Sequence, residues 1–170
     1  DIGTGNIQVK NIENLEGGSN NDTLYGSSKD NEIYGLVGND TLYGLGGSDS
    51  LYGGDDSDTL FGGTGNDILD GGAGIDTVNY SDSDSVILTL ANTGSSALAK
   101  IGIEEDTVTN VENIVGSEYA DTLGGNSDNN ILDGGLGSDT LIASDGIDTL
   151  IGGSGTDTID YSARSNAIEV

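Results

Sequence analysis

The chain has 170 residues, of which 30 are acidic and four are basic, so its formal net charge is −26. It contains 30 glycines and no histidine, cysteine, methionine, tryptophan or proline. This composition excludes disulfides, zinc sites built on Cys or His, and nucleophiles activated by histidine, and the charge repels nucleic acid. No apolar run of about 18 residues is present, so we expect no membrane span. Cations are the expected partners.

A nine-residue repeat dominates the sequence. Residues 17–79 read as seven consecutive blocks of nine, and residues 116–160 read as five more. The sixth place is Asp in ten units and Asn in two, and the eighth place is aliphatic in all twelve. A hydrophobic content of 33% with this net charge normally predicts disorder, but a flexible linker would lack the phase. The repeat therefore predicts an ordered solenoid.

Each unit predicts a turn followed by a short strand. Six glycine-rich or polar residues form the turn, and the aliphatic at the centre of the next three points inward. Two units then make one coil, with strands on opposite faces and coils about 4.8 Å apart. The expected fold class is all-β: a parallel β-roll, or β-solenoid, built as two tandem rolls joined by a β-rich insert.

In chain order we expect four segments. Ser85–Leu90 alternates apolar and polar residues, which predicts a strand between the two runs, although a flexible linker is an alternative there. Because the chain starts at Asp1 rather than Met and stops inside a strand-like pattern, we expect it to be cut from a longer protein. The segments are a first β-roll with a leading strand segment (1–80), a β-rich insert or capping segment (81–115), a second β-roll (116–161) and the truncated start of a further strand (162–170).

The units resemble the nonapeptide G-G-x-G-x-D-x-U-x of the repeat-in-toxin (RTX, or hemolysin-type) family. GGTGNDILD, GGAGIDTVN, GGLGSDTLI and GGSGTDTID match it fully, whereas GSSKDNEIY and GNSDNNILD match it poorly. The resemblance implies a right-handed β-roll that binds calcium, in a bacterial protein secreted by a type I pathway and located outside the cell or on its surface. The parent could be a toxin, adhesin, lipase, protease or surface-layer protein.

Calcium takes about six to eight oxygens from carboxylates and backbone carbonyls. Sixth-place residues 18 apart meet on one edge of the roll, and their carboxylates repel one another unless a divalent ion lies between them. The expected side-chain ligands are Asp22, Asp40, Asp49, Asp58, Asp67, Asp76, Asp121, Asp139, Asp148, Asp157, Asn31 and Asn130. The resemblance adds the carbonyls of turn glycines, namely Gly35, Gly44, Gly53, Gly62, Gly63, Gly65, Gly71, Gly72, Gly74, Gly134, Gly135, Gly137, Gly152, Gly153 and Gly155.

If one ion lies between each pair of units that are adjacent on the same edge, the chain has about eight calcium sites. One aliphatic per nine residues makes a small core, so we expect the calcium-free chain to be disordered and folding to be coupled to binding. The sites near Asn31 and Asn130 are weak matches, and the ammonium of Lys29 could replace a cation in the first of them.

Columns of aromatic residues and of threonines on the surface suggest other functions. Tyr25, Tyr43 and Phe61 fall on one face, and Tyr34 and Tyr52 fall on the other. Such rings could bind glycan or stack on one another as a structural ladder. The threonine column of the seventh place, Thr23, Thr41, Thr59 and Thr77, suggests ice binding, but strand propensity explains it equally well. We predict no catalytic residue and no enzyme activity.

Overall fold

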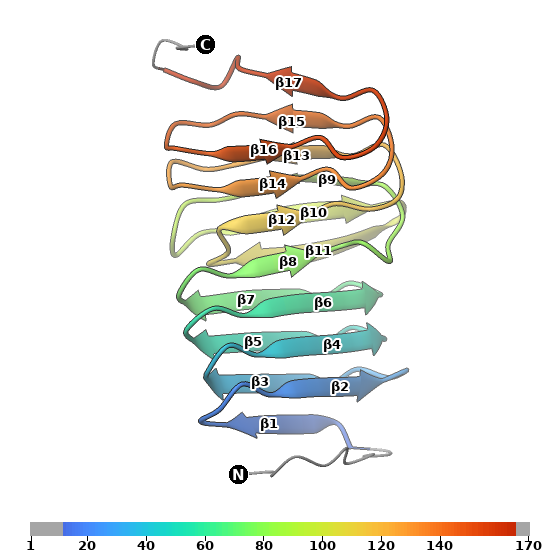
Figure 1. Cartoon of the computed structure of the whole chain (residues 1–170). Coiled ribbons are helices and arrows are strands. Elements are labelled where there is room, and N and C mark those ends of the chain that lie inside the picture. The colour runs from blue at the N-terminus through green and yellow to red at the C-terminus, as the bar shows by residue number, and fades with distance from the viewer. Residues whose placement is uncertain (1–11, 166–170) are drawn as a thin grey trace.

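The computed structural model describes residues 12–165, and within that range the chain forms 17 β-strands and no helix. The strands stack into a solenoid of two facing sheets, which confirms the all-β solenoid expected from the repeat (Figure 1). In spatial order, the seven-stranded sheet contains β16 (Thr149–Ile151), β14 (Ile131–Asp133), β12 (Asn113–Val115), β8 (Thr77–Asn79), β6 (Thr59–Thr64), β4 (Thr41–Gly46) and β2 (Thr23–Ser27). The ten-stranded sheet contains β1 (Asn14–Gly18), β3 (Glu32–Val37), β5 (Ser50–Asp55), β7 (Ile68–Ala73), β11 (Glu104–Thr109), β10 (Ser96–Ile101), β9 (Val86–Thr89), β13 (Thr122–Gly124), β15 (Thr140–Ile142) and β17 (Thr158–Asp160).

Consecutive coils pair in parallel with a shift of 18 residues. Ile33 of β3 lies opposite Leu51 of β5, and Leu42 of β4 lies opposite Leu60 of β6. Successive units therefore alternate between the two sheets, as two units per coil require. Side chains at the same place of the unit therefore form one column along each of the two sheets.

The core is one cluster of eighth-place aliphatics, which form two facing columns between the sheets. Those of the inner coils are fully buried: Ile33, Leu42, Leu51, Leu60, Leu69, Val78, Leu123, Leu132 and Leu141. Leu24 and Leu150 are only half-buried and Ile159 is exposed, because the coils at the two ends have a neighbour on one side only. Buried residues of the insert, such as Leu88 and Val108, belong to the same cluster and join the two runs.

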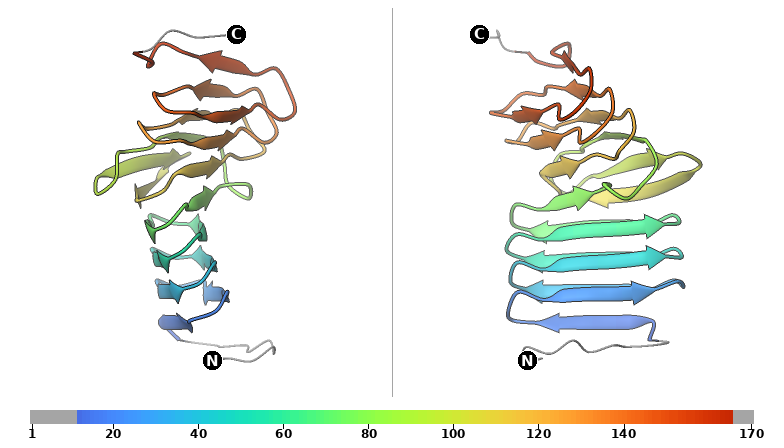
Figure 2. Two further views of the ribbon diagram at one scale, coloured as in Figure 1. Left: turned by 60° about the vertical axis from the view of Figure 1, so that its left-hand side comes forward. Right: turned by 45° about the vertical axis from the view of Figure 1, so that its right-hand side comes forward.

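The insert between the runs is built of strands, not of flexible linker. In the ten-stranded sheet, β11 pairs in parallel with β7, and β9 pairs in parallel with β13. Between them β10 runs antiparallel to both. The seven-stranded sheet passes directly from β8 to β12. The β10–β11 hairpin thus projects from one side of the stack (Figure 2).

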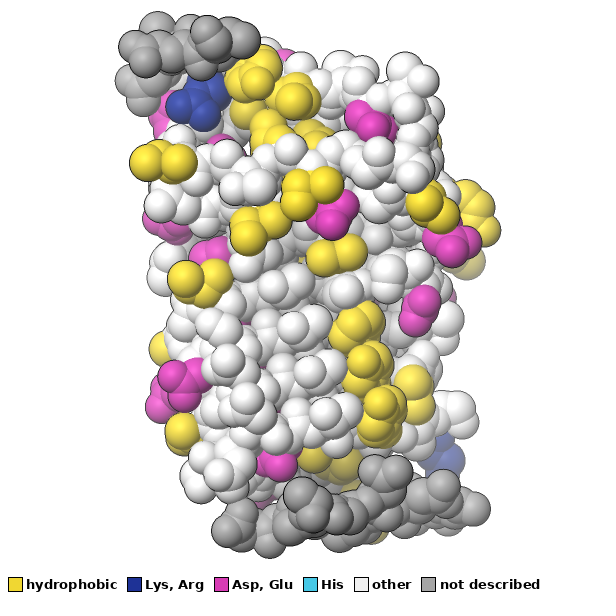
Figure 3. Space-filling model, in the orientation of Figure 1, with side chains coloured by type: hydrophobic (Ala, Val, Ile, Leu, Met, Phe, Trp, Pro, Cys, Tyr) yellow, Lys and Arg dark blue, Asp and Glu magenta, His cyan; other side chains and the backbone are white. Residues whose placement is uncertain are grey.

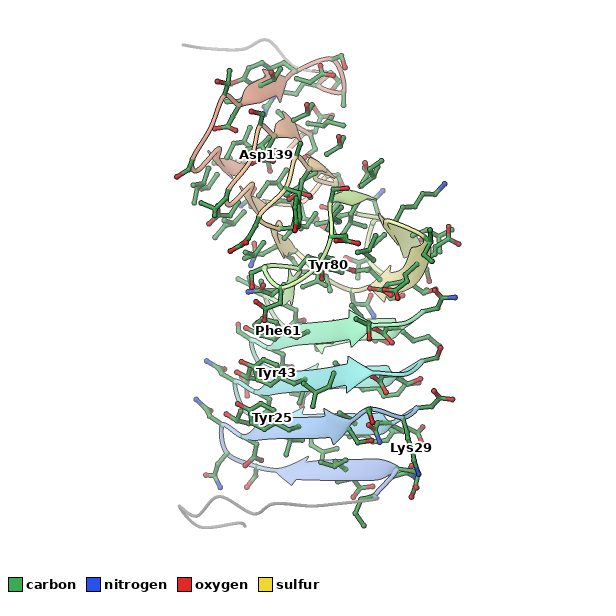
Figure 4. All side chains as sticks on the ribbon, turned by 90° about the vertical axis from the view of Figure 1, so that its right-hand side faces the viewer. Tyr25, Lys29, Tyr43, Phe61, Tyr80 and Asp139 are labelled. Carbon is green, nitrogen blue, oxygen red and sulfur yellow. The ribbon has the colours of Figure 1, made fainter. Side chains whose placement is uncertain are left out.

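The aromatic side chains of the first run stack along the solenoid axis. The ring centroids of Tyr25 and Tyr43 are 4.6 Å apart, and those of Tyr43 and Phe61 are 4.4 Å apart, with nearly parallel planes (Figure 4). Tyr34 and Tyr52 stack in the same way at 4.8 Å on the other sheet. Because the ring faces lie against one another, the geometry favours a structural ladder.

At the C-terminal end, residues 161–164 form a turn in which the Arg164 N–H donates to the Tyr161 carbonyl at 3.1 Å. The rest of the strand expected over 162–170, and the first eleven residues of the leading segment, lie outside the described residues. Over residues 12–165, no helix is long and apolar enough to cross a lipid bilayer.

Candidate metal site

The sixth residue of each unit ends its turn, immediately before the strand. Along the inner coils these side chains are almost completely buried; Asp58, for example, is 1% exposed. Acidic side chains visible on the surface are scattered, because the repeat aspartates lie inside the stack (Figure 3). A column of buried carboxylates requires partners that compensate its charge.

One oxygen of each carboxylate is held by the coil before it. The backbone N–H of Asp40 donates to Asp58 Oδ1 at 2.7 Å, and the N–H of Asp58 donates to Asp76 Oδ1 at 2.8 Å. The same bond recurs between Asp121 and Asp139 at 2.9 Å in the second run. This ladder brings the predicted ligands together in columns, with the spacing of 18 residues expected from the sequence.

The other oxygen, Oδ2, has no hydrogen-bond partner at six of these positions within the described chain. The six residues are Asp40, Asp49, Asp58, Asp67, Asp76 and Asp139. A buried anionic oxygen without a partner carries a large desolvation cost. Such an oxygen therefore needs either a proton or a cation.

Backbone carbonyls converge on the same oxygens. A Cβ added to Gly35 would collide with both Asp40 Oδ2 and the Gly53 carbonyl of the next coil. At Gly17, the added atom would lie 2.8 Å from Asp22 Oδ2 and 2.5 Å from the Gly35 carbonyl. The first place must therefore be glycine wherever the carboxylate and the carbonyl share this space. The carbonyls placed in this way are those of Gly35, Gly44, Gly53, Gly62, Gly71, Gly134 and Gly152.

The remaining predicted carbonyls belong to second- and fourth-place glycines, which stack on the same places of the neighbouring coil. Gly72 lies against the Gly54 carbonyl, and Gly153 lies against the Gly135 carbonyl. The Gly135 carbonyl also accepts a hydrogen bond from the Ser154 N–H at 2.9 Å. These glycines therefore bring the backbones of turns in neighbouring coils into contact.

Burial raises the pKa of the column carboxyls. Desolvation is the largest cause, and neighbouring carboxylates add to it. The pKa is raised from 3.8 to about 6 for Asp49 and Asp58 and to about 7 for Asp76. The pKa values of Asp40, Asp67 and Asp139 are raised for the same reason. The hydrogen bond from the preceding backbone N–H lowers each pKa but does not offset burial.

The insert supplies two carboxylates that the repeat pattern missed. Asp106 Oδ1 accepts the Asp67 N–H at 2.9 Å, and its Oδ2 accepts the hydroxyl of buried Tyr80 at 3.2 Å. Glu112 Oε2 accepts the Asp76 N–H at 2.8 Å. Glu112 could have been found by counting back 18 residues from Asn130. Asp106 could not, because it lies 39 residues after Asp67, on the second strand of the β10–β11 hairpin.

Asn110 completes the turn at the same junction. Its carbonyl lies beside Gly71 and Asp76, where the carbonyl of a first-place glycine lies in the other coils. Asn110 has a φ of 50°, a left-handed conformation that asparagine tolerates better than most residues. The insert therefore continues the column past the end of the first run.

The donor set suits a hard cation. Carboxylate and carbonyl oxygens are the ligands that calcium prefers. No group of three or more acidic side chains that could hold a metal forms among residues 12–165, so most ligands would be carbonyls. Buried Oδ2 atoms meet this requirement beside glycine carbonyls at Asp40, Asp49, Asp58 and Asp139 and beside the Asn110 carbonyl at Asp76. With Asp67, whose Oδ2 is also buried without a partner among residues 12–165, these residues would hold the ion.

These features define a class: a parallel β-solenoid whose stacked glycine turns present paired carboxylate and carbonyl oxygens. The model of the RTX calcium-binding nonapeptide repeat matches four segments of the chain, at residues 16–51, 43–78, 109–141 and 133–163. The chain therefore belongs to the RTX calcium-binding nonapeptide repeat family.

Two further comparisons concern curated proteins and solved structures. No curated protein matches the sequence. Among solved structures, the chain is similar to the solution structure of the AlgE6R3 subunit from the Azotobacter vinelandii mannuronan C5-epimerase, with 21% identity and a TM-score of 0.29. The similarity covers 57% of this chain and 72% of that chain.

Proposed function

We propose that the chain is a structural module of a larger extracellular protein, and that it folds when calcium binds between its coils. The observation that carries this proposal is the set of six buried Oδ2 atoms without a partner in the described chain. Protons could neutralise them in acid, but near neutral pH a divalent cation is the partner that fits carboxylate and carbonyl oxygens.

The proposed ligands are the sixth-place side chains and the first-place glycine carbonyls. Asp106 and Glu112 extend the two columns at the junction with the insert. Adjacent units on each edge provide about eight candidate sites, each shared between two coils. Because each ion would join two coils, its binding energy would contribute directly to the folding free energy.

Several properties support an exported parent protein. A chain without cysteine needs no disulfide to fold outside the cell. A net charge of −26 opposes compaction until cations neutralise part of it. Membership of the RTX family adds the expectation of a bacterial protein secreted unfolded by a type I pathway. On this proposal the two runs and the insert, with boundaries near residues 80 and 115, act as one rigid spacer.

The test is a calcium titration of the full chain followed by far-UV circular dichroism, with magnesium as the control. We expect a cooperative transition from coil to β-structure at roughly micromolar to millimolar calcium, which magnesium does not reproduce. If the chain keeps the same β-structure in excess chelator, or if magnesium is equally effective, calcium-coupled folding is refuted.

A further inference from the structure

The second place of each unit adopts one of two backbone conformations. In seven units its φ is positive; the residues are Leu36, Leu45, Gly54, Gly63, Gly72, Gly135 and Gly153. In the other five units it is not; the residues are Gly18, Ser27, Ser117, Asn126 and Ser144. The left-handed conformation costs a non-glycine residue about 1–2 kcal/mol, so Leu36 and Leu45 hold it against their own preference.

Where φ is not positive, the second residue is bonded to the sixth side chain of its own unit. The Ser117 N–H donates to Asp121 Oδ2 at 2.6 Å, and its hydroxyl lies 2.9 Å and 3.1 Å from Oδ1 and Oδ2. Ser27 donates to Asn31 Oδ1 through its N–H at 2.6 Å and its hydroxyl at 3.1 Å.

The other three units of this kind follow the same rule. The Ser144 hydroxyl donates to Asp148 Oδ2 at 2.9 Å. The Asn126 N–H donates to Asn130 Oδ1 at 2.8 Å, and the Asn130 amide donates to the Glu112 carbonyl at 2.8 Å. In the first unit the Gly18 N–H donates to Asp22 Oδ2 at 2.7 Å.

Where φ is positive, the sixth carboxylate is left open. The seven units carry Asp40, Asp49, Asp58, Asp67, Asp76, Asp139 and Asp157. All but Asp157 have a buried Oδ2 without a partner within residues 12–165, and Asp157 is half-buried in the last coil. The second-place conformation thus divides the carboxylates into an open set and a set that the chain itself satisfies.

We propose that the second place decides which units bind calcium. A left-handed residue there leaves Oδ2 open to the cation, whereas a residue without a positive φ closes its unit by donating to the sixth side chain, as Gly18, Ser27, Ser117, Asn126 and Ser144 do. This inference rests on the proposed calcium function and narrows it. The ions gather in the first run and at Asp139; Asp157 is not counted, because it is only half-buried in the last described coil, so the number falls from about eight to about six.

The second run is accordingly held together mainly by its own hydrogen bonds. Asp121, Asn130 and Asp148 are closed, and the unit of Asp148 has Ala143 at its first place, where the other eleven units have glycine. Asp121 differs, because Gly116 and the Gly134 carbonyl are placed around it as in an open unit. Only the second residue closes the Asp121 unit.

Ser117 is therefore the position to test. Ser117→Gly removes the hydroxyl and admits a positive φ, so the number of calcium ions bound by the full chain should rise by one, from about six to about seven. Ser117→Ala is the matched control. It removes the hydroxyl but keeps the N–H bond to Asp121, so the number should not change.

The reciprocal variant is Leu45→Ser. A Cβ is already accommodated at this position, and the new hydroxyl can close Asp49, so the chain should lose one ion. Stoichiometry is measured by equilibrium dialysis with radioactive calcium, and folding of each variant in saturating calcium is checked by circular dichroism. If Ser117→Gly does not fold, Leu45→Ser alone decides the outcome.

The outcomes separate this inference from the proposed function. A wild-type chain that binds no calcium overturns both. A wild-type chain that binds about eight ions, or an unchanged number in both Ser117→Gly and Leu45→Ser, overturns the inference and leaves calcium binding in place. If Ser117→Ala loses an ion, the hydroxyl is a ligand rather than a closing donor, and the inference is wrong.

Discussion

Asp58→Asn should change the stability of the chain in opposite directions with and without calcium. Without calcium, burial raises the pKa of Asp58 from 3.8 to about 6, so at pH 7.5 the folded state holds a carboxylate that it disfavours. One pKa unit corresponds to about 1.36 kcal/mol, and partial screening at the solenoid edge reduces the total, so removal of the charge should stabilise the calcium-free fold by about 1–3 kcal/mol. An amide can also donate to a carbonyl, as Asn130 does.

With calcium the sign reverses. An ion present at about 100 times its dissociation constant stabilises the fold by about 2.7 kcal/mol, and most of this is lost when its charged ligand is removed. Both effects are measured by urea unfolding, followed by far-UV circular dichroism. One series is run in chelator and one in calcium, and both contain the same concentration of a stabilising osmolyte. Asp82→Asn is the control, because it removes the same charge from an exposed loop. A change of the same sign in both conditions would refute the reasoning.

Three further predictions concern the turns, the columns and the aromatic ladder. Gly53→Ala places a Cβ against Asp58 Oδ2 and the Gly71 carbonyl and should destabilise the calcium-loaded chain by about 1–3 kcal/mol in urea unfolding, whereas Gly18→Ala, whose nearest contact is 3.6 Å away, should not. In chelator, the folded chain binds more protons than the unfolded chain between about pH 4 and pH 7, because the carboxyl pKa values are raised. Its stability should therefore fall as the pH rises through this window; β-structure that is constant from pH 4.5 to 7.5 would contradict this. Tyr43→Ala removes a ring stacked on both faces and should cost more than about 1 kcal/mol of stability while the number of bound calcium ions stays the same; a lost ion would show that the ladder is part of the metal site.

Much of the fold could be predicted from the sequence because a solenoid repeats local information. An aliphatic at every eighth place and a turn before it determine which side chains are buried, and the period of nine determines that residues 18 apart are neighbours. The burial of Leu51, Leu60 and their equivalents, and the column that contains Asp40 and Asp58, followed from counting alone. Within the insert, the alternating pattern of residues 85–90 predicts the strand β9.

Three features were decided only by the tertiary structure. The β10–β11 hairpin brings Asp106 onto Asp67, a pairing across 39 residues that no period predicts. The direct pairing of β8 with β12 makes Glu112 the next member of the Asp76 column. The backbone conformation of the second place separates Asp121 from Asp139, although both are equivalent aspartates in the repeat. The period specifies where a carboxylate lies, whereas its hydrogen-bond partners depend on φ angles and on contacts between coils that are distant in the chain.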